Sequence, residues 1–239
     1  MNSLLSVKDL YKGFKGLRAL AGISFTLKSS ELLCIIGPNG AGKTVLLNVI
    51  SGVYPPDSGE IIFNNKNIEK LDMPSRVKLG ISRTFQIPRV FNSLTVIENL
   101  LIPAFTIRKM SYNEALREAE KILKFIRLDH LKYELSKNLS GGQKKLLEIG
   151  RALMTSPRLM LLDEPLAGVN PILAELIIEV LRGLIERGIS VIIVNHETLY
   201  LKKIKPDRVL AMSSGRIIAE GPLEDVISNK AVIESYLGR

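Results

Sequence analysis

The sequence contains no tryptophan, a single cysteine and few aromatic residues, which make up 5% of its 239 residues. Because one thiol cannot form a disulfide within the chain, Cys34 excludes a disulfide-stabilised secreted fold. The first residues lack the basic start and long apolar run of a signal peptide. No uncharged apolar run approaches the ~18 residues that a membrane-spanning helix needs. These absences predict a soluble, cytosolic chain.

A clustered basic surface is also missing, although the net charge is +9. The longest basic runs are pairs, such as Lys144-Lys145 and Lys202-Lys203, and no basic stripe alternates with aromatic residues. Nucleic-acid-binding domains usually carry such a stripe. We therefore interpret the charge as a solvated surface and expect no nucleic acid partner. The apolar fraction of 46% and the length suit one large folded domain.

Hydrophobic periodicity predicts an α/β fold. Residues 4–10 and 19–28 alternate like antiparallel strands, whereas residues 31–37 form a short continuous apolar run, typical of a buried parallel strand. A helix is expected at 43–52, closed by its final glycine, and a further strand is expected at 80–86. The first third of the chain therefore combines both strand types with a helix.

A helical insert interrupts this pattern. From about residue 95 to 127 the apolar positions recur at helical spacing without a strand pattern, and Ser111 with Glu114 forms a capping-box signature. Strand and helix patterns alternate again from residue 159, and the tail at 223–237 is predicted to form two helices. Alternation of this kind implies a mainly parallel sheet with covering helices.

The segment at 37–44, "GPNGAGKT", fits the phosphate-loop pattern G-x-x-x-x-G-K-[ST] at every fixed position. A predicted strand precedes it and a predicted helix follows. Its glycines let backbone amides turn inward, and the helix adds its positive N-terminal end. Lys43 would supply charge to the outer phosphates of a nucleotide, and Thr44 would supply a hydroxyl to Mg²⁺. A glycine-rich turn with an incidental lysine is the alternative, which motif and context together disfavour.

Two carboxylates, Asp163 and Glu164, end the apolar run at 159–164. Side chains at the carboxyl end of a strand in an open sheet face the ligand crevice. Asp163 is predicted to hold Mg²⁺, and Glu164 is predicted to accept a proton from an attacking water. Acidic residues are also common where a strand meets a polar turn. The phosphate loop needs a partner for its metal and so favours the functional interpretation.

Gln86 and His196 are candidates by position. Gln86 ends the predicted strand at 80–86, from which its carbonyl oxygen could reach Mg²⁺ or the attacking water. His196 follows the apolar run at 189–195 and would meet the same edge of the sheet, where a histidine can donate to a γ-phosphate. Taken singly, each is as well interpreted as a turn or core residue. We assign no role to the other histidine, His130.

A second glycine-rich helix start, "LSGGQ", occupies residues 139–143. Ser140 and Gln143 match a capping box, which explains the segment as local structure. Two consecutive glycines are, however, unfavourable in a first helical turn. A ligand that closely approaches the backbone of Gly141 and Gly142 explains them better.

The ordered set of these motifs resembles the nucleotide-binding subunit of an ABC transporter over essentially the whole chain. The resemblance implies an α/β P-loop NTPase fold of the ABC ATPase type. Such a fold has a mainly parallel core sheet, an antiparallel β-subdomain and an all-helical subdomain. Residues 1–239 would then form a single ATPase domain. Within it, 1–86 and 157–239 would form the core and β-subdomain, and about 87–156 the helical subdomain that carries the signature LSGGQ.

The same resemblance implies how the chain works. Two subunits, as a homodimer or a heterodimer of related chains, would bind head to tail. Each ATP with its Mg²⁺ would lie between the phosphate loop of one subunit and LSGGQ of the other. Hydrolysis would drive transport through transmembrane permease subunits, which places the chain in the cytoplasm, peripheral on the inner face of the cell membrane.

The residues that match the family's functional positions fall into three groups. The implied nucleotide contacts come from Phe14, Asn39, Gly40, Ala41, Gly42, Lys43, Thr44, Val45, Ser140, Gly141, Gly142 and Gln143. The implied catalytic residues are Glu164, His196 and Gln86. The implied metal ligands are Thr44, Gln86 and Asp163.

Three positions need comment. Phe14 matches the aromatic residue that stacks on adenine, and Tyr11 is a rival candidate. Val45 stands where a threonine commonly contacts the α-phosphate, so only its backbone amide remains for that contact. The loop at 167–170, which in the family crosses to the partner subunit, ends in Asn170 where many members have Asp.

The sequence segments around Gln86 and Asp163 resemble those of the LivG-type subunit of branched-chain amino acid importers. This resemblance implies that Arg89 to Phe91 contact the permease. Two alternatives are a subunit for another solute and a single-domain ABC ATPase that acts as an assembly factor. A GTPase would need an Asn-Lys-x-Asp motif to recognise guanine, and Ile68 stands where the Asp of that motif is required. A small-molecule kinase has no reason to carry LSGGQ.

Overall fold

Two β-sheets organise the computed structural model, which describes residues 3–195 and 198–237. The larger sheet is parallel except for one antiparallel edge pair, β9 with β10. In spatial order its strands are β10 (Arg216–Gly221), β9 (Arg208–Ser213), β3 (Leu32–Ile36), β8 (Ser190–Val194), β7 (Leu159–Asp163) and β6 (Ile81–Arg83). Every residue of β3, β7 and β8 is buried, as expected for strands covered on both faces.

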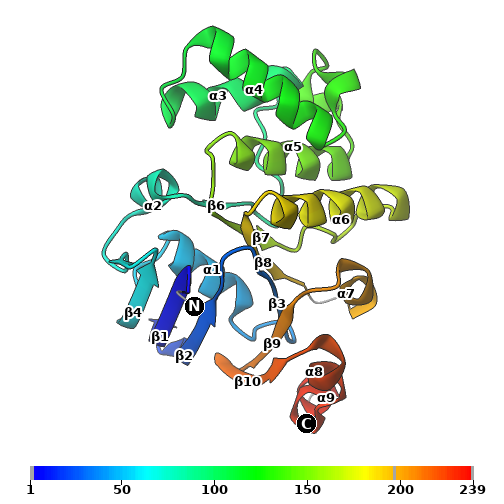
Figure 1. Ribbon diagram of the computed structural model, residues 1–239. Coiled ribbons are helices and arrows are strands. Elements are labelled where there is room, and N and C mark those ends of the chain that lie inside the picture. The colour runs from blue at the N-terminus through cyan, green and yellow to red at the C-terminus, as the bar shows by residue number, and fades with distance from the viewer. Residues whose placement is uncertain (1–2, 196–197, 238–239) are drawn as a thin grey trace.

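The smaller sheet is antiparallel and packs beside the larger one (Figure 1). Its order is β2 (Leu17–Leu27), β1 (Leu5–Phe14), β4 (Ser58–Phe63) and β5 (Lys66–Asn67). Buried side chains of this sheet, such as Val7, share one apolar cluster with Leu33 of β3 and Leu46 of α1 (Lys43–Ser51). The sheet therefore braces the helix that follows the phosphate loop. The predicted strands at the start of the chain and the helix closed by Gly52 are confirmed.

A helical layer lies over the larger sheet (Figure 1). It contains α3 (Val96–Thr106), α4 (Tyr112–Phe125) and α5 (Gly141–Leu153), and α6 (Pro171–Glu186) lies between α5 and the sheet. One apolar cluster joins Leu100, Ile149 and Ile177 across three of these helices. Ser111 and Glu114 form the predicted capping box of α4. The division of the chain near residues 86 and 157 stays a prediction.

Two elements differ from expectation. Helix α2 (Met73–Leu79) was not predicted, although Asp72 caps it through the Ser75 amide and a proline stands in its first turn. Strand β6 ends at Arg83, so Gln86 does not end the strand as predicted. The chain leaves the sheet because the Glu148 carboxylate of α5 accepts the amide hydrogens of Phe85 and Arg89, 3.3 and 3.0 Å away.

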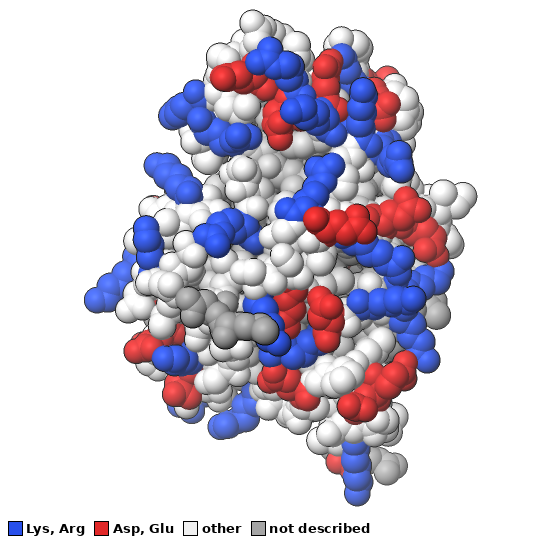
Figure 2. Space-filling view, in the orientation of Figure 1, with Lys and Arg blue, Asp and Glu red and all other residues white. Residues whose placement is uncertain are grey.

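The remaining elements complete the second half of the chain. Helix α7 (Thr198–Ile204) follows the gap in the described residues. The tail forms α8 (Leu223–Ser228) and α9 (Lys230–Leu237), which confirms the two predicted helices. Over the described ranges, none of the helices has the length and apolar character needed to span a bilayer. On the face shown in Figure 2, basic and acidic side chains are interspersed.

Candidate functional site

The phosphate loop joins β3 to α1, and its shape depends on glycine. Gly37 has φ 148° and Gly42 has φ 99°. A Cβ atom at Gly37 would lie 2.1 Å from the carbonyl oxygen of Met212, so no other residue fits there without movement. The buried Lys43 folds over the loop, and its Nζ donates to the carbonyls of Gly37 and Pro38 at 2.7 and 2.9 Å. Burial lowers the pKa of Lys43, and Glu164 and Asp163 oppose this shift.

Asp163 and Thr44 meet at the end of β7, as the motifs predict. The Thr44 hydroxyl lies 3.3 Å from one carboxylate oxygen of Asp163. The other oxygen lies 3.3 Å from the Arg83 guanidinium, and both side chains of this ion pair are 2% exposed. Burial raises the pKa of Asp163, and the charge of Arg83 opposes that rise. One oxygen of Asp163 therefore contacts Thr44 beside the phosphate loop, while the other oxygen is paired with Arg83.

Gln86 and Glu164 contact each other directly. The Gln86 side-chain amide donates to a carboxylate oxygen of Glu164 at 2.9 Å. Glu164 has φ 49°, a left-handed conformation that is uncommon for a residue with a side chain. Its amide donates to the carbonyl of Val194 at 3.0 Å, which fixes the turn to the end of β8. The structure thus brings Gln86 to the Glu164 carboxylate although Gln86 lies in a loop.

A cleft of about 540 Å³ is lined by Lys43, Thr44, Gln86 and Glu164 but not by Asp163, and its volume is within the usual range for a small-ligand site. Phe14 lies at the cleft, 37% exposed, with its ring edge-on to Tyr54. Tyr11, the rival candidate for adenine stacking, does not line this cleft in the described part of the chain. The predicted residues that do line it are Phe14, Asn39, Gly40, Ala41, Gly42, Lys43, Thr44, Val45, Gln86 and Glu164. The prediction for His196 lies outside the described residues.

The LSGGQ segment starts α5 and forms a capping box, as its local interpretation predicts. The Ser140 side chain accepts from the Gln143 amide at 3.3 Å, and the Gln143 side chain accepts from the Ser140 amide at 2.8 Å. Ser140 and Gly141 are exposed. Among the described lining residues of the cleft, none comes from 139–143. Within one chain, the two glycine-rich segments therefore do not face the same cavity.

The two glycines of LSGGQ have different environments, which corrects the expectation that a ligand explains both. A Cβ atom at Gly142 would lie 2.7 Å from Leu173 and 3.0 Å from Val169, so packing against α6 and its preceding loop already favours a glycine there. A Cβ atom at Gly141 would meet nothing within 4 Å. Only Gly141 is left for the close approach of a ligand to explain.

Three further residues shape the site. Asn170 caps α6, because its side-chain oxygen accepts from the Leu173 amide at 2.9 Å. Arg83 and Lys145 both contact the strand-end segment of β7, and the sequence analysis assigned neither a role. No local signal marked either residue, because Arg83 stands between Ser82 and Thr84 and Lys145 is the second residue of a basic pair.

The geometry identifies the class of protein. A phosphate loop follows a central strand of a mainly parallel sheet, and carboxylates end the strand two places along. Ligands of open α/β sheets bind at this carboxyl edge, where the cleft lies. These features define a P-loop nucleotide hydrolase.

Comparison with known proteins gives the family. Residues 20–167 match the family described as ABC transporter. The chain is 39% identical to the probable branched-chain amino acid transport ATP-binding protein LivG of Archaeoglobus fulgidus, with 98% of this chain and 95% of that protein covered. It is 33% identical to the lipopolysaccharide export system ATP-binding protein LptB of Escherichia coli K12, with 98% and 97% covered. The crystal structure of a nucleotide-free ATP-binding cassette from an ABC transporter matches at a TM-score of 0.90 and 36% identity, with 100% of both chains covered.

The chain therefore belongs to the ABC transporter family. It is an ATP-binding, ATP-hydrolysing subunit with the ABC ATPase fold, which confirms the predicted family, fold class and enzyme activity. The C-terminal residues 216–239 also match a family described as branched-chain amino acid ATP-binding cassette transporter. The roles of the individual site residues stay predictions.

Proposed function

We propose that the chain powers the import of branched-chain amino acids, as a dimer bound to transmembrane permease subunits on the inner face of the membrane. The match of residues 216–239 to a branched-chain amino acid transporter family is the observation that supports this class of solute. The motifs that handle ATP do not contact the transported solute and so give no information about it. The greater identity to a LivG protein than to LptB supports the same class. A subunit for another solute and a non-transport assembly ATPase are the alternatives that the experiment below tests.

In this proposal the cleft binds ATP. The ring of Phe14 stacks on adenine, and the amides of residues 39–45 with the Lys43 ammonium hold the phosphates. Glu164 accepts the proton of the attacking water, and its hydrogen bond from Gln86 orients the carboxylate. His196 is proposed to donate to the γ-phosphate, and it lies outside the described residues.

Magnesium fits the oxygen atoms that meet beside the loop. The Thr44 hydroxyl and the Asp163 carboxylate lie 3.3 Å apart, and Mg²⁺ prefers such hard oxygen ligands together with waters and substrate phosphates. Within the described ranges, no cluster of three or more His, Cys, Asp or Glu side chains could hold a metal alone. We propose that Thr44, Asp163 and the Gln86 carbonyl hold the ion, which neutralises charge on the phosphates when bound.

The separation of LSGGQ from the cleft supports a dimer. Ser140 and Gly141 are exposed at the start of α5, and the positive N-terminal end of a helix suits an anion. We propose that Ser140, Gly141, Gly142 and Gln143 bind the γ-phosphate of ATP held by a second subunit. The second subunit is either another copy or a related chain.

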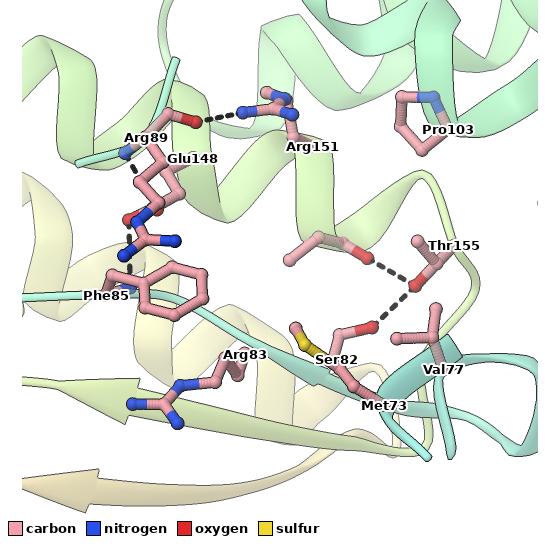
Figure 3. Close-up of a pocket in the computed structure, with 11 residues that line it drawn as sticks. Met73, Val77, Ser82, Arg83, Phe85, Arg89, Pro103, Glu148, Arg151 and Thr155 are labelled. Carbon is pink, nitrogen blue, oxygen red and sulfur yellow. Dashed lines mark hydrogen bonds between the residues drawn. The ribbon is translucent and has the colours of Figure 1, made fainter. Parts of the chain in front are cut away.

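A pocket of about 280 Å³ beside the Gln86 loop is the proposed permease contact (Figure 3). The Arg89 guanidinium lies over the Phe85 ring at 4.2 Å, and Arg151 lies over Phe91 at 4.5 Å. Glu148 accepts the amides of Phe85 and Arg89, on both sides of Gln86. A permease segment bound in this pocket would therefore press on the loop that positions Gln86.

Purification from native membranes followed by reconstitution tests the proposal. A tagged chain is expected to bring down a membrane protein, and vesicles holding the complex should take up leucine when ATP is supplied. Glu164→Gln should retain ATP binding and lose uptake, whereas Glu60→Gln, at an exposed position, should behave as wild type. Recovery of a soluble assembly factor without any membrane protein would contradict the proposal, and so would ATP-driven uptake of another solute in place of leucine.

A further inference from the structure

A buried lysine joins α5 to the loop that carries Glu164. Lys145 is 8% exposed and lies on α5 just beyond LSGGQ. Its Nζ donates to the backbone carbonyl of Glu164 at 2.8 Å and to that of Ala167 at 2.7 Å. Both carbonyls belong to the turn between β7 and α6. The side chain therefore holds two points of this turn, three residues apart.

The turn that Lys145 holds has an unfavourable backbone conformation. Glu164 has φ 49°, which a residue with a Cβ adopts only when surrounding contacts enforce it. The Ala167 amide also donates to the Glu164 carbonyl, at 3.2 Å, so this carbonyl accepts two hydrogen bonds. Because the direction of a side chain follows its backbone angles, these bonds determine where the Glu164 carboxylate points. They leave that carboxylate at the cleft, where Gln86 donates to it.

Lys145 contacts the backbone of the turn that carries Glu164. Its ammonium is directed at backbone carbonyls on the turn that carries the carboxylate, and its own side chain does not line the cleft among the described residues. A buried ammonium is costly to desolvate unless it is well paired, so apolar packing alone does not explain a lysine at this position.

We propose that Lys145 is a positioning residue for ATP hydrolysis, which holds the Glu164 turn in the conformation that aims the carboxylate at the attacking water. This inference rests on the proposed role of Glu164 as the base. It requires that the ammonium be needed for the chemical step and not for nucleotide binding, because the phosphate loop and Phe14 lie on other elements.

The test compares two neighbouring lysines in the purified full-length chain. Lys145→Met keeps most of the side-chain stem and removes the ammonium, and Lys144→Met, at the more exposed neighbouring position, is the matched control. Displacing a reacting group by about 1 Å can lower a rate by ~100-fold, so we expect kcat of Lys145→Met to fall about 10- to 100-fold. KM for ATP and the equilibrium binding of a fluorescent ATP analogue should stay at wild-type values. Lys145→Arg should recover most of the activity, because its guanidinium can donate to both carbonyls.

Several results would overturn the inference. Unchanged kcat in Lys145→Met would do so, as would an equal loss in Lys144→Met. A fall in ATP binding that matches the fall in kcat would assign Lys145 a structural role instead. If Lys145→Met does not fold, Lys145→Leu, which also lacks a donor, is measured in the same way, and full kcat in that variant overturns the inference. Normal turnover in Glu164→Gln would overturn the proposed role of Glu164 itself, so the two failures are distinguishable.

Discussion

At the residue scale, the buried pair of Arg83 and Asp163 connects the site to the core. The Arg83 guanidinium contacts Asp163 at the end of β7 and also donates to the side chains of Ser51 and Asn48, which belong to α1. One arginine therefore links β6, β7 and the helix that follows the phosphate loop. Removing one partner of a buried ion pair is costly because the other charge is left unpaired.

We predict that Arg83→Met lowers the free energy of unfolding by about 3 kcal/mol at pH 8. Burial already raises the folded-state pKa of Asp163 above its ordinary value of 3.8. A raised carboxyl pKa means that the folded state binds the proton more tightly, so stability falls as pH rises from 3.8 towards the folded-state pKa and is constant above it. Loss of Arg83 should raise this pKa further. Urea unfolding should therefore show a smaller deficit at pH 5 than at pH 8.

Arg89→Met serves as the control for this experiment, because Arg89 is exposed and its guanidinium lies over the Phe85 ring at 4.2 Å, as that of Arg83 does at 4.8 Å. Its effect on stability should stay within about 0.5 kcal/mol at both pH values. A deficit for Arg83→Met that is equal at pH 5 and pH 8 would show that Asp163 does not respond to the missing charge.

The sequence was informative about residues whose roles follow from local spacing. Lys43, Thr44 and Asp163 were located by motifs, because a phosphate loop and a strand-end carboxylate are each encoded within a few positions. Arg83 contacts Asp163, 80 positions away along the chain, and Lys145 contacts Glu164, 19 positions away. Such contacts are fixed by the packing of elements and have no local pattern. The need for a small residue at Gly142 could not be predicted from local sequence either, because its neighbours Val169 and Leu173 belong to α6 and the loop before it.

At the scale of elements, the start of α5 allows a matched pair of glycine substitutions. Gly142→Ala places a methyl group against Leu173 and Val169 and should cost about 1–3 kcal/mol of stability. Gly141→Ala meets open space and should change stability little or raise it by up to about 1 kcal/mol, since alanine favours a helix. If ATP of the partner subunit approaches this backbone, Gly141→Ala should nevertheless lower ATPase activity. Thermal unfolding and steady-state hydrolysis of both variants check this.

The Gly141 result decides between two explanations of LSGGQ. Full ATPase activity in Gly141→Ala, with unchanged stability, would leave helix capping by Ser140 and Gln143 as the whole function of the segment. Lost activity with retained stability requires a ligand at the exposed helix end. Gly142→Ala calibrates the measurement, because its loss of activity should accompany a loss of stability.

The boundaries of helices and strands show which sequence signals are sufficient to predict where an element begins or ends. Ser111 and Ser140 marked helix starts correctly because a capping box satisfies backbone amides through side chains three positions apart. The predicted end of β6 was wrong because the Glu148 carboxylate of a distant helix accepts the amide hydrogens of Phe85 and Arg89, which therefore do not join the sheet. The strand at 80–86 was predicted from its own residues, and a local pattern does not reveal a hydrogen-bond acceptor on another element.

At the scale of the whole molecule, the proposed function requires the chain to present two incomplete halves of a nucleotide site. The cleft has the phosphate loop and the Glu164 carboxylate, and the exposed end of α5 has Ser140 and Gly141. Two copies related by a twofold axis would place the same pair of surfaces together twice, which makes two complete sites. The arrangement in trans therefore makes a prediction about mixed dimers that an arrangement within one chain does not.

We predict that Lys43→Ala and Ser140→Arg variants, each inactive alone, recover ATPase activity when mixed. In a mixed dimer one site combines the Lys43→Ala loop with the Ser140→Arg signature, so it carries both defects, and the other site carries neither. Random mixing of isologous dimers allows up to about a quarter of wild-type activity. If the signature acted on its own chain's cleft, every site would carry one defect and no activity would return. Differently tagged chains, purified over both tags, establish that mixed dimers are present, and their inactivity would exclude the arrangement in trans.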